Sequence, residues 1–169
     1  MKVLLYLLFI VLSVNPSFGQ INKGVAPGVI GSVYRDIKEL DQFKGYKLKE
    51  GALIEPIETH YALNEIVKGT HTIILFDKVL AMPNSNKVQY EILDTVTVGE
   101  VGSGKIVMMT SCRINKANDC EIIGLVKNTG KEKYTLLLKA WRANRKTNKI
   151  EKIPVKGISC VDLNFDPED

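Results

Sequence analysis

The sequence is poor in the residues that nucleophilic and metal chemistry use, with two histidines and three cysteines among 169 residues. A catalytic triad needs a nucleophile, a base and an orienting group, and neither His60 nor His71 lies in a recognisable motif. A structural zinc site needs closely spaced cysteine and histidine pairs, whereas Cys112 and Cys120 are separated by seven residues and no histidine is near. We therefore expect no metal, no cofactor and no enzymatic activity.

Long apolar runs are also scarce, and the one that stands out lies at the N-terminus. A lysine precedes Val3–Val14, Asn15–Pro16 breaks the run, and Ser17–Gly19 supplies the small residues of a cut before Gln20. This order is typical of a secretory signal peptide, and twelve helical residues span only about 18 Å of a bilayer core of roughly 30 Å. We expect residues 1–19 to be removed, which leaves residues 20–169 as one secreted or periplasmic domain without a membrane span.

A nucleotide loop is nearly present but incomplete. Residues 99–106 read GEVGSGKI, one residue short of the pattern GxxxxGKS/T, and Ile106 stands where the magnesium-binding hydroxyl belongs. A phosphate loop needs a helix after it, whereas Lys105–Met109 favours a strand. The sequence therefore predicts that these glycines turn a hairpin and bind no nucleotide.

Most of the chain alternates with the period of a β-strand. In residues 87–98 (KVQYEILDTVTV) the even positions are apolar except Asp94, which predicts a long, half-buried and bent strand. Further strands are expected at residues 72–82, 105–112, 121–127, 133–143, 149–155 and 157–165. Residues 53–69 are ambiguous between a strand and a short helix, and Ser32 is placed to cap a short helix with Val33, Ile37 and Leu40 on one face. The expected fold is mainly β, a small antiparallel barrel or sandwich of about seven strands with a short N-terminal helix.

Basic residues gather between Lys127 and Lys156, where ten lysines and arginines face only Glu132 and Glu151. A strand at residues 133–143 places Lys139 and Trp141 on one side. Its other side is expected to face the core and carries Tyr134, Leu136, Leu138 and Ala140. Together with Arg142 and Arg145, the first side could form a face for an anionic envelope component or an acidic protein. The alternative is that the lysines keep a hairpin soluble and guard its edge, with Trp141 partly covered by the N-terminal helix. Nucleic acid is scarce in the periplasm, so we expect no nucleic-acid partner.

Two resemblances bear on the fold. The block from Asp77 to Cys160 resembles the small uncharacterised exported proteins common in Bacteroidetes, a resemblance that implies no activity. It is carried by EILDTV (91–96), Cys112, EIIGLV (121–126), KAWRAN (139–144) and KGISC (156–160). The order of a long curved strand, a glycine turn, a strand ending in cysteine and a strand rich in Tyr and Leu is similar to netrin-like OB barrels. In that group a Cys-Gly step is typical, and Cys112-Arg113 stands in its place.

One disulfide is expected in an exported protein, and three cysteines leave one thiol over. Chain geometry favours Cys112–Cys120, because the two residues flank a short polar loop. The resemblance to the exported proteins implies Cys112–Cys160 instead.

The function predicted from the sequence is that of an exported, non-enzymatic binding or interaction protein of the cell envelope, with an unknown ligand. One alternative is a β-barrel that carries a small ligand, which requires a cavity lined by apolar side chains. Another is a hydrolase, which requires titratable residues that converge in a cleft.

Overall fold

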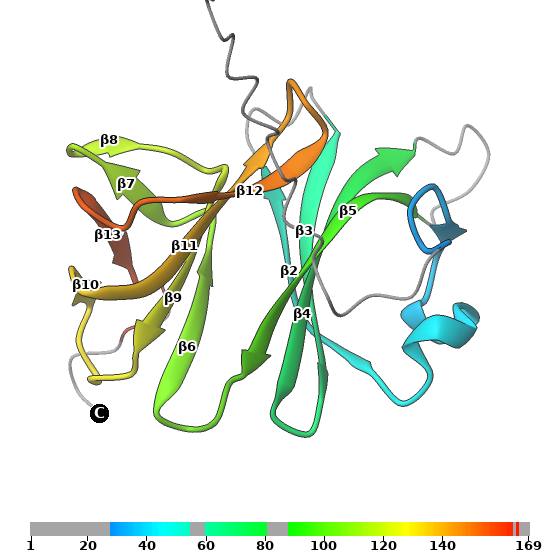
Figure 1. The fold of residues 1–169 in the computed structure, drawn as a ribbon, viewed down its shortest axis with the longest axis horizontal. Coiled ribbons are helices and arrows are strands. Elements are labelled where there is room, and N and C mark those ends of the chain that lie inside the picture. Colours follow the sequence, from blue (N-terminus) through cyan, green and yellow to red (C-terminus); the bar gives the residue numbers. More distant parts are fainter. Residues whose placement is uncertain (1–27, 55–59, 81–87, 164, 166–169) are drawn as a thin grey trace, which may run out of the picture.

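The computed structural model describes residues 28–54, 60–80, 88–163 and 165. This part of the chain is mainly β and forms three antiparallel sheets (Figure 1). The predicted fold class is therefore confirmed. No helix among the described residues has the length and apolar character needed to span a membrane.

The largest sheet has five strands in the order β1-β5-β4-β3-β2. Its members are β1 (Val33–Tyr34), β2 (Lys47–Ile54), β3 (Tyr61–Lys68), β4 (His71–Leu80) and β5 (Gln89–Glu100). The segment that was ambiguous between strand and helix thus supplies the end of β2 and all of β3. Residues 55–59 lie outside the described residues.

The second sheet has the order β12-β11-β9-β6 and packs against the five-stranded sheet (Figure 1). Its members are β6 (Lys105–Met109), β9 (Ile122–Lys127), β11 (Leu137–Asn144) and β12 (Lys149–Ile153). The third sheet has the order β10-β13-β7-β8. It consists of β7 (Cys112–Ile114), β8 (Ala117–Asn118), β10 (Lys133–Tyr134) and β13 (Ile158–Val161).

The described residues contain thirteen strands rather than about seven. Two expected strands divide between sheets, and β1, β2, β3 and β8 come from segments without a firm strand prediction. The expected strand at residues 133–143 becomes β10 in the third sheet and β11 in the second. The glycine turn behaves as expected: β5 ends at Glu100, β6 begins at Lys105, and the Lys105 N–H donates to the Gly102 carbonyl at 3.0 Å. A strand therefore follows the near-miss nucleotide loop.

The expected N-terminal helix is wrong. Val33 and Tyr34 are held extended because β1 pairs with β5 at Glu91 and Tyr90. Two single 3-10 turns follow, η1 (Ile37–Glu39) and η2 (Asp41–Phe43), and Asp36 rather than Ser32 caps the first. Because Leu40 is again extended, no continuous helix forms.

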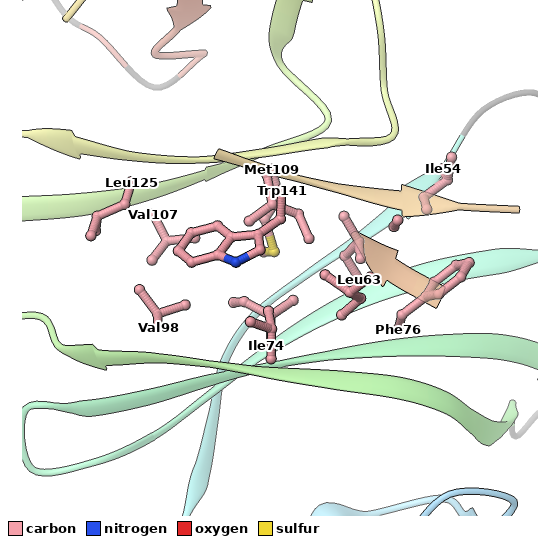
Figure 2. Close-up of a cluster of buried hydrophobic side chains, with 13 residues drawn as sticks. Ile54, Leu63, Ile74, Phe76, Val98, Val107, Met109, Leu125 and Trp141 are labelled. Carbon is pink, nitrogen blue, oxygen red and sulfur yellow. The ribbon is translucent and has the colours of Figure 1, made fainter. Parts of the chain in front are cut away.

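An apolar cluster fills the space between the five-stranded and second sheets (Figure 2). Trp141 from β11 lies among Ile74, Val98, Val107, Met109 and Leu125, which come from both sheets. A separate cluster covers the opposite, outer face of the five-stranded sheet, where the segment around Val29, Ile37 and Phe43 packs on Ile66, Ile73, Leu75 and Ile92. The five-stranded sheet is therefore buried on both faces over much of its area.

The bend expected at Asp94 is a β-bulge. Phe76 pairs with Asp94 and Asp77 with Ile92, so residue 93 is extra. As a result Ile92 joins the outer cluster while Val96 and Val98 join the cluster between the sheets. The even positions of this strand do not share one face, although the strand itself was predicted.

Candidate functional site

The basic face expected from the sequence does not form as predicted. Trp141 is only 7% exposed, because the second sheet packs on the five-stranded sheet with this ring between them. Lys139 is exposed at the edge of the same contact, with its Nζ 3.5 Å from the Val98 carbonyl. Of the side expected in the core, Tyr134 and Ala140 are buried, but Leu136 and Leu138 are exposed. Leu136 lies in the gap between β10 and β11. Leu138 is the extra residue of a bulge between Leu137 and Lys139, which shifts the alternation.

The two arginines of that predicted face are held in an ion-pair cluster. The Arg145 Nε lies 2.6 Å from Glu121 Oε1, and an Arg142 guanidinium nitrogen lies 3.7 Å from Glu121 Oε2. Arg142 also donates to Asp119. These carboxylates neutralise much of the local positive charge, so Arg142 and Arg145 are poorly suited to a polyanion. Asp119 and Glu121 were not among the candidates from the sequence.

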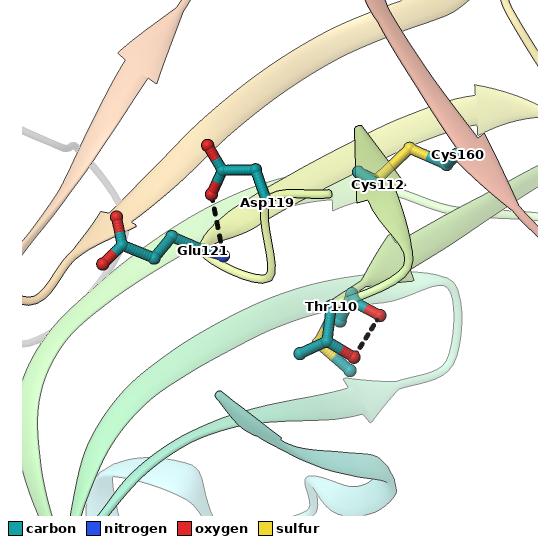
Figure 3. The surroundings of a disulfide bond; sticks show 6 residues. Thr110, Cys112, Asp119, Glu121 and Cys160 are labelled. Atoms are coloured by element: carbon teal, nitrogen blue, oxygen red, sulfur yellow. Dashed lines mark hydrogen bonds between the residues drawn. A yellow bond between two sulfur atoms is a disulfide. The ribbon is translucent and has the colours of Figure 1, made fainter. Parts of the chain in front are cut away.

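The disulfide joins Cys112 to Cys160, with 3.9 Å between their Cα atoms (Figure 3). The two cysteines are directly paired residues of β7 and β13, and both are buried. Cys120 is half-buried and is not part of this bond. The pairing implied by the resemblance is present, and the one favoured by the short loop is not.

A pocket of about 380 Å³ opens on the outer face of the five-stranded sheet, and we call it the outer-sheet pocket. Its walls come from β1, η1, β2, β3 and β5. It is lined by Tyr34, Arg35, Asp36, Ile37, Lys38, Lys47, Leu48, Asn64, Ile66 and Tyr90. The chain segment that replaces the expected helix therefore forms one wall, and the edge strand β2 forms the opposite one.

Charge and apolar surface are separated in the outer-sheet pocket. Arg35, Lys38 and Lys47 are exposed and outnumber the single acid, Asp36, which forms an exposed ion pair with Lys38 at 3.8 Å. Ile37 and Ile66 are buried beneath them. The rings of Tyr34 and Tyr90 are in contact, with centroids 5.5 Å apart. The arrangement offers positive charge at the rim and an apolar, aromatic interior.

A buried carboxylate lies behind the floor of the outer-sheet pocket. The Tyr34 hydroxyl donates to Asp77 Oδ2 at 2.9 Å, and the Asn64 amide donates to the same oxygen at 2.8 Å. Asp77 is 0% exposed, and its Oδ1 has no hydrogen-bond partner among the described residues. The two donors line the pocket, whereas Asp77 itself does not.

Burial is the largest influence on the pKa values of Asp77 and Tyr34. It raises the pKa of Asp77 to about 7, although the hydrogen bonds from Asn64 and Tyr34 favour the ionised form. Burial and the adjacent Asp77 carboxyl also raise the pKa of the Tyr34 hydroxyl, which stays protonated and acts as a donor.

Close approach of two strands fixes the position of the Asn64 amide. Asn64 pairs with Gly51 of β2, and a Cβ atom at residue 51 would lie 2.6 Å from Asn64 Oδ1. Glycine is therefore the residue that lets this amide lie flat over the neighbouring strand and reach Asp77.

The two histidines are not brought together. His60 precedes β3, and His71 begins β4, at the opposite end of the β3–β4 pair. His71 Nδ1 is hydrogen-bonded to the Tyr46 hydroxyl at 2.8 Å. Within the described ranges, no three Cys, His, Asp or Glu side chains gather as a metal site would require.

None of the residues of the outer-sheet pocket was a candidate from the sequence. The available signal was Asp77, an acid inside the apolar run TIILFDKVL. Comparison of the chain with protein-family models, with curated proteins and with solved structures found no significant match. The resemblances to exported proteins and netrin-like barrels therefore stay predictions.

Proposed function

We propose that this chain is an exported, non-enzymatic binding protein that holds a small organic anion with an apolar body in the outer-sheet pocket. The pocket carries the proposal, because about 380 Å³ of space combines three cations, two tyrosine rings and an apolar wall. Small-ligand sites typically have apolar walls with a few polar groups that fix the ligand's orientation. A carboxylate or sulfonate would lie at the rim cations, and the apolar body would cover Ile37 and Leu48.

Binding rather than catalysis is supported by what lines the pocket. Nucleophilic catalysis needs an activated nucleophile in hydrogen-bond reach of a base, and no serine, threonine, cysteine or histidine is among the described residues of the lining. The Tyr34 hydroxyl does reach the Asp77 carboxyl, but burial raises the pKa of Tyr34, which makes this hydroxyl a poor nucleophile. Asp77 lies behind Tyr34 and Asn64, so its carboxyl does not touch a ligand in the pocket. A ligand inside a barrel is less well supported, because side chains fill the space between the sheets (Figure 2).

Export is the second part of the proposal. It is supported by the signal-like order of residues 1–19 and by the disulfide, since such bonds persist in oxidising compartments. The mass of the intact protein from its native host tests it, because the expected chain begins at Gln20. A mass that includes residues 1–19 would contradict the proposal that the chain is exported and cleaved before Gln20.

The binding proposal is tested with two probes that share one aromatic body. Anilinonaphthalene sulfonate carries a permanent negative charge, and N-phenylnaphthylamine lacks it. We expect saturable fluorescence enhancement with the sulfonate and weaker binding of the neutral probe. Changing Arg35, Lys38 and Lys47 together to Gln should weaken sulfonate binding by about tenfold, at roughly 0.5 kcal/mol for each exposed charge.

The matched control removes the same net charge elsewhere. Lys116, Lys133 and Lys156 are exposed and do not line the outer-sheet pocket. Changing these three residues to Gln should leave sulfonate affinity within about twofold, since distant exposed charges are largely screened. Equal losses in both triple variants, or equal affinity for both probes, would contradict a specific anion site.

A further inference from the structure

The Asp77 carboxyl is separated from the outer-sheet pocket by one layer of side chains. Tyr34 and Asn64 each present one surface to the pocket and donate to Asp77 Oδ2 from the other. The carboxyl is completely shielded from water, and Oδ1 has no hydrogen-bond partner in the described part of the chain. The charge on Asp77 is therefore screened less in the pocket than the charge of a surface carboxylate would be.

The groups around Asp77 do not cancel that charge. Tyr34 faces it from β1, the uncharged Asn64 from β3, and Tyr90 lies beside Tyr34 on β5. The charged groups of the pocket are Arg35, Asp36 and Lys38 after β1, and Lys47 on β2. Among the described residues, no cation forms an ion pair with Asp77.

A bound anion and an ionised Asp77 would be like charges on the two sides of this floor. If the two charges are taken to be about 10 Å apart, with an effective dielectric constant of about 20, Coulomb's law gives a difference of roughly 15-fold in affinity. Because linkage is reciprocal, an anion that binds more tightly to the protonated form also favours protonation of Asp77.

We propose that the outer-sheet pocket takes up its anion together with a proton on Asp77. This inference rests on the proposed function and adds its regulation: binding is tighter in mildly acidic solution and weaker in mildly alkaline solution. Burial raises the pKa of Asp77 to about 7, so the proton is exchanged close to neutrality rather than in strong acid. The bound anion raises that pKa further.

The test measures affinity for anilinonaphthalene sulfonate between about pH 5.5 and pH 8.5, across the range in which a carboxyl of this kind changes charge. We expect the dissociation constant of the unaltered protein to rise by roughly tenfold over this range, which approaches the 15-fold limit for full ionisation of Asp77. Asp77→Asn should bind with nearly constant affinity, close to the low-pH value of the unaltered protein. Glu132→Gln, an exposed acid outside the pocket, should keep the full pH dependence.

A second measurement uses the unaltered protein. It tests the proton coupling even if the Asp77→Asn variant does not fold. Calorimetric titration at slightly alkaline pH, in buffers of different ionisation enthalpy, should show net proton uptake with the sulfonate and none with N-phenylnaphthylamine. Sulfonate binding that is independent of pH, or without proton uptake, would overturn the proton coupling and leave the anion site standing. Absence of sulfonate binding at every pH would overturn the anion site itself, and the coupling with it.

Discussion

Removal of the Cys112–Cys160 disulfide should remove a large part of the stability of this fold. The bond links β7 to β13 across 48 residues of sequence, and that loop contains β8 to β12. In the chain-entropy model, a cross-link acts by restricting the unfolded chain. For a loop of this length the model gives about 4 kcal/mol at room temperature, which is a large share of the 5–15 kcal/mol typical of domains.

The perturbation is the double variant Cys112→Ala with Cys160→Ala. Both side chains are buried, and the two sulfur atoms fill space over Gly124, so their removal adds a smaller packing loss of about 1 kcal/mol. The midpoint of thermal unfolding should fall by roughly 10 °C or more. Cys120→Ala is the matched control, because it removes the half-buried thiol without opening the disulfide.

Trp141 reports the transition without a label. It is the only tryptophan and is 7% exposed in the cluster between the sheets, so its emission should shift to longer wavelength on unfolding. Urea titrations of the two variants and of the parent protein give the free energies of unfolding. A loss below about 1 kcal/mol in the double variant, with an unchanged dependence on urea, would refute the loop-closure reasoning.

Three further perturbations test separate contacts by the same unfolding measurement. Asp94→Ala should cost about 1–3 kcal/mol, because the Ile150 N–H between the sheets loses its acceptor; an unchanged midpoint would contradict this. Gly124→Ala should cost about 1–3 kcal/mol, since the added methyl group would lie 2.9 Å from Cys160 Sγ, and a neutral effect would show that the third sheet yields easily. Because the pKa of Asp77 is raised to about 7, the folded protein keeps a proton that the unfolded chain releases near pH 4, so stability should fall as pH rises from about 4 to 7. Asp77→Asn should lessen that slope, and an identical slope in both proteins would refute the assignment.

The local sequence pattern predicts where most of the strands lie, but it does not predict which side chains lie on which face of each strand. The β-branched alternation at residues 87–98 predicts β5 because a strand's period is visible in its own residues. The bulges at residue 93 and between Leu137 and Lys139 are set by the register with partner strands. A one-residue shift exchanges the two faces of a strand, so the bulge places Leu138 on the surface. Trp141 is buried for a different reason, because both faces of β11 are covered: Ala140 lies in one apolar cluster and Trp141 in another.

Long-range pairing also decided the N-terminal segment and the disulfide. Val33, Ile37 and Leu40 have helical spacing, yet β1 pairs with residues of β5 that lie more than fifty positions away. Cys160 is brought to Cys112 by the pairing of β7 with β13, which the short loop before Cys120 does not reveal. The composition of a short segment carries no information about such partners, so these features required the structure.

Asp77 and Asp94 lie beside the same bulge and show why one acid is a candidate for function and the other is not. Asp94 uses both carboxylate oxygens: Oδ1 accepts from the Thr95 N–H at 2.9 Å and Oδ2 from the Ile150 N–H at 2.8 Å. Its role in joining the two sheets is therefore explained by the fold alone. Asp77 is buried with one oxygen that has no partner among the described residues, an arrangement that costs stability. The two hydrogen bonds to Oδ2 do not require an acid, since the amide oxygen of an Asn could accept both. The proposed proton-coupled binding in the outer-sheet pocket gives the acid a role that these two contacts do not.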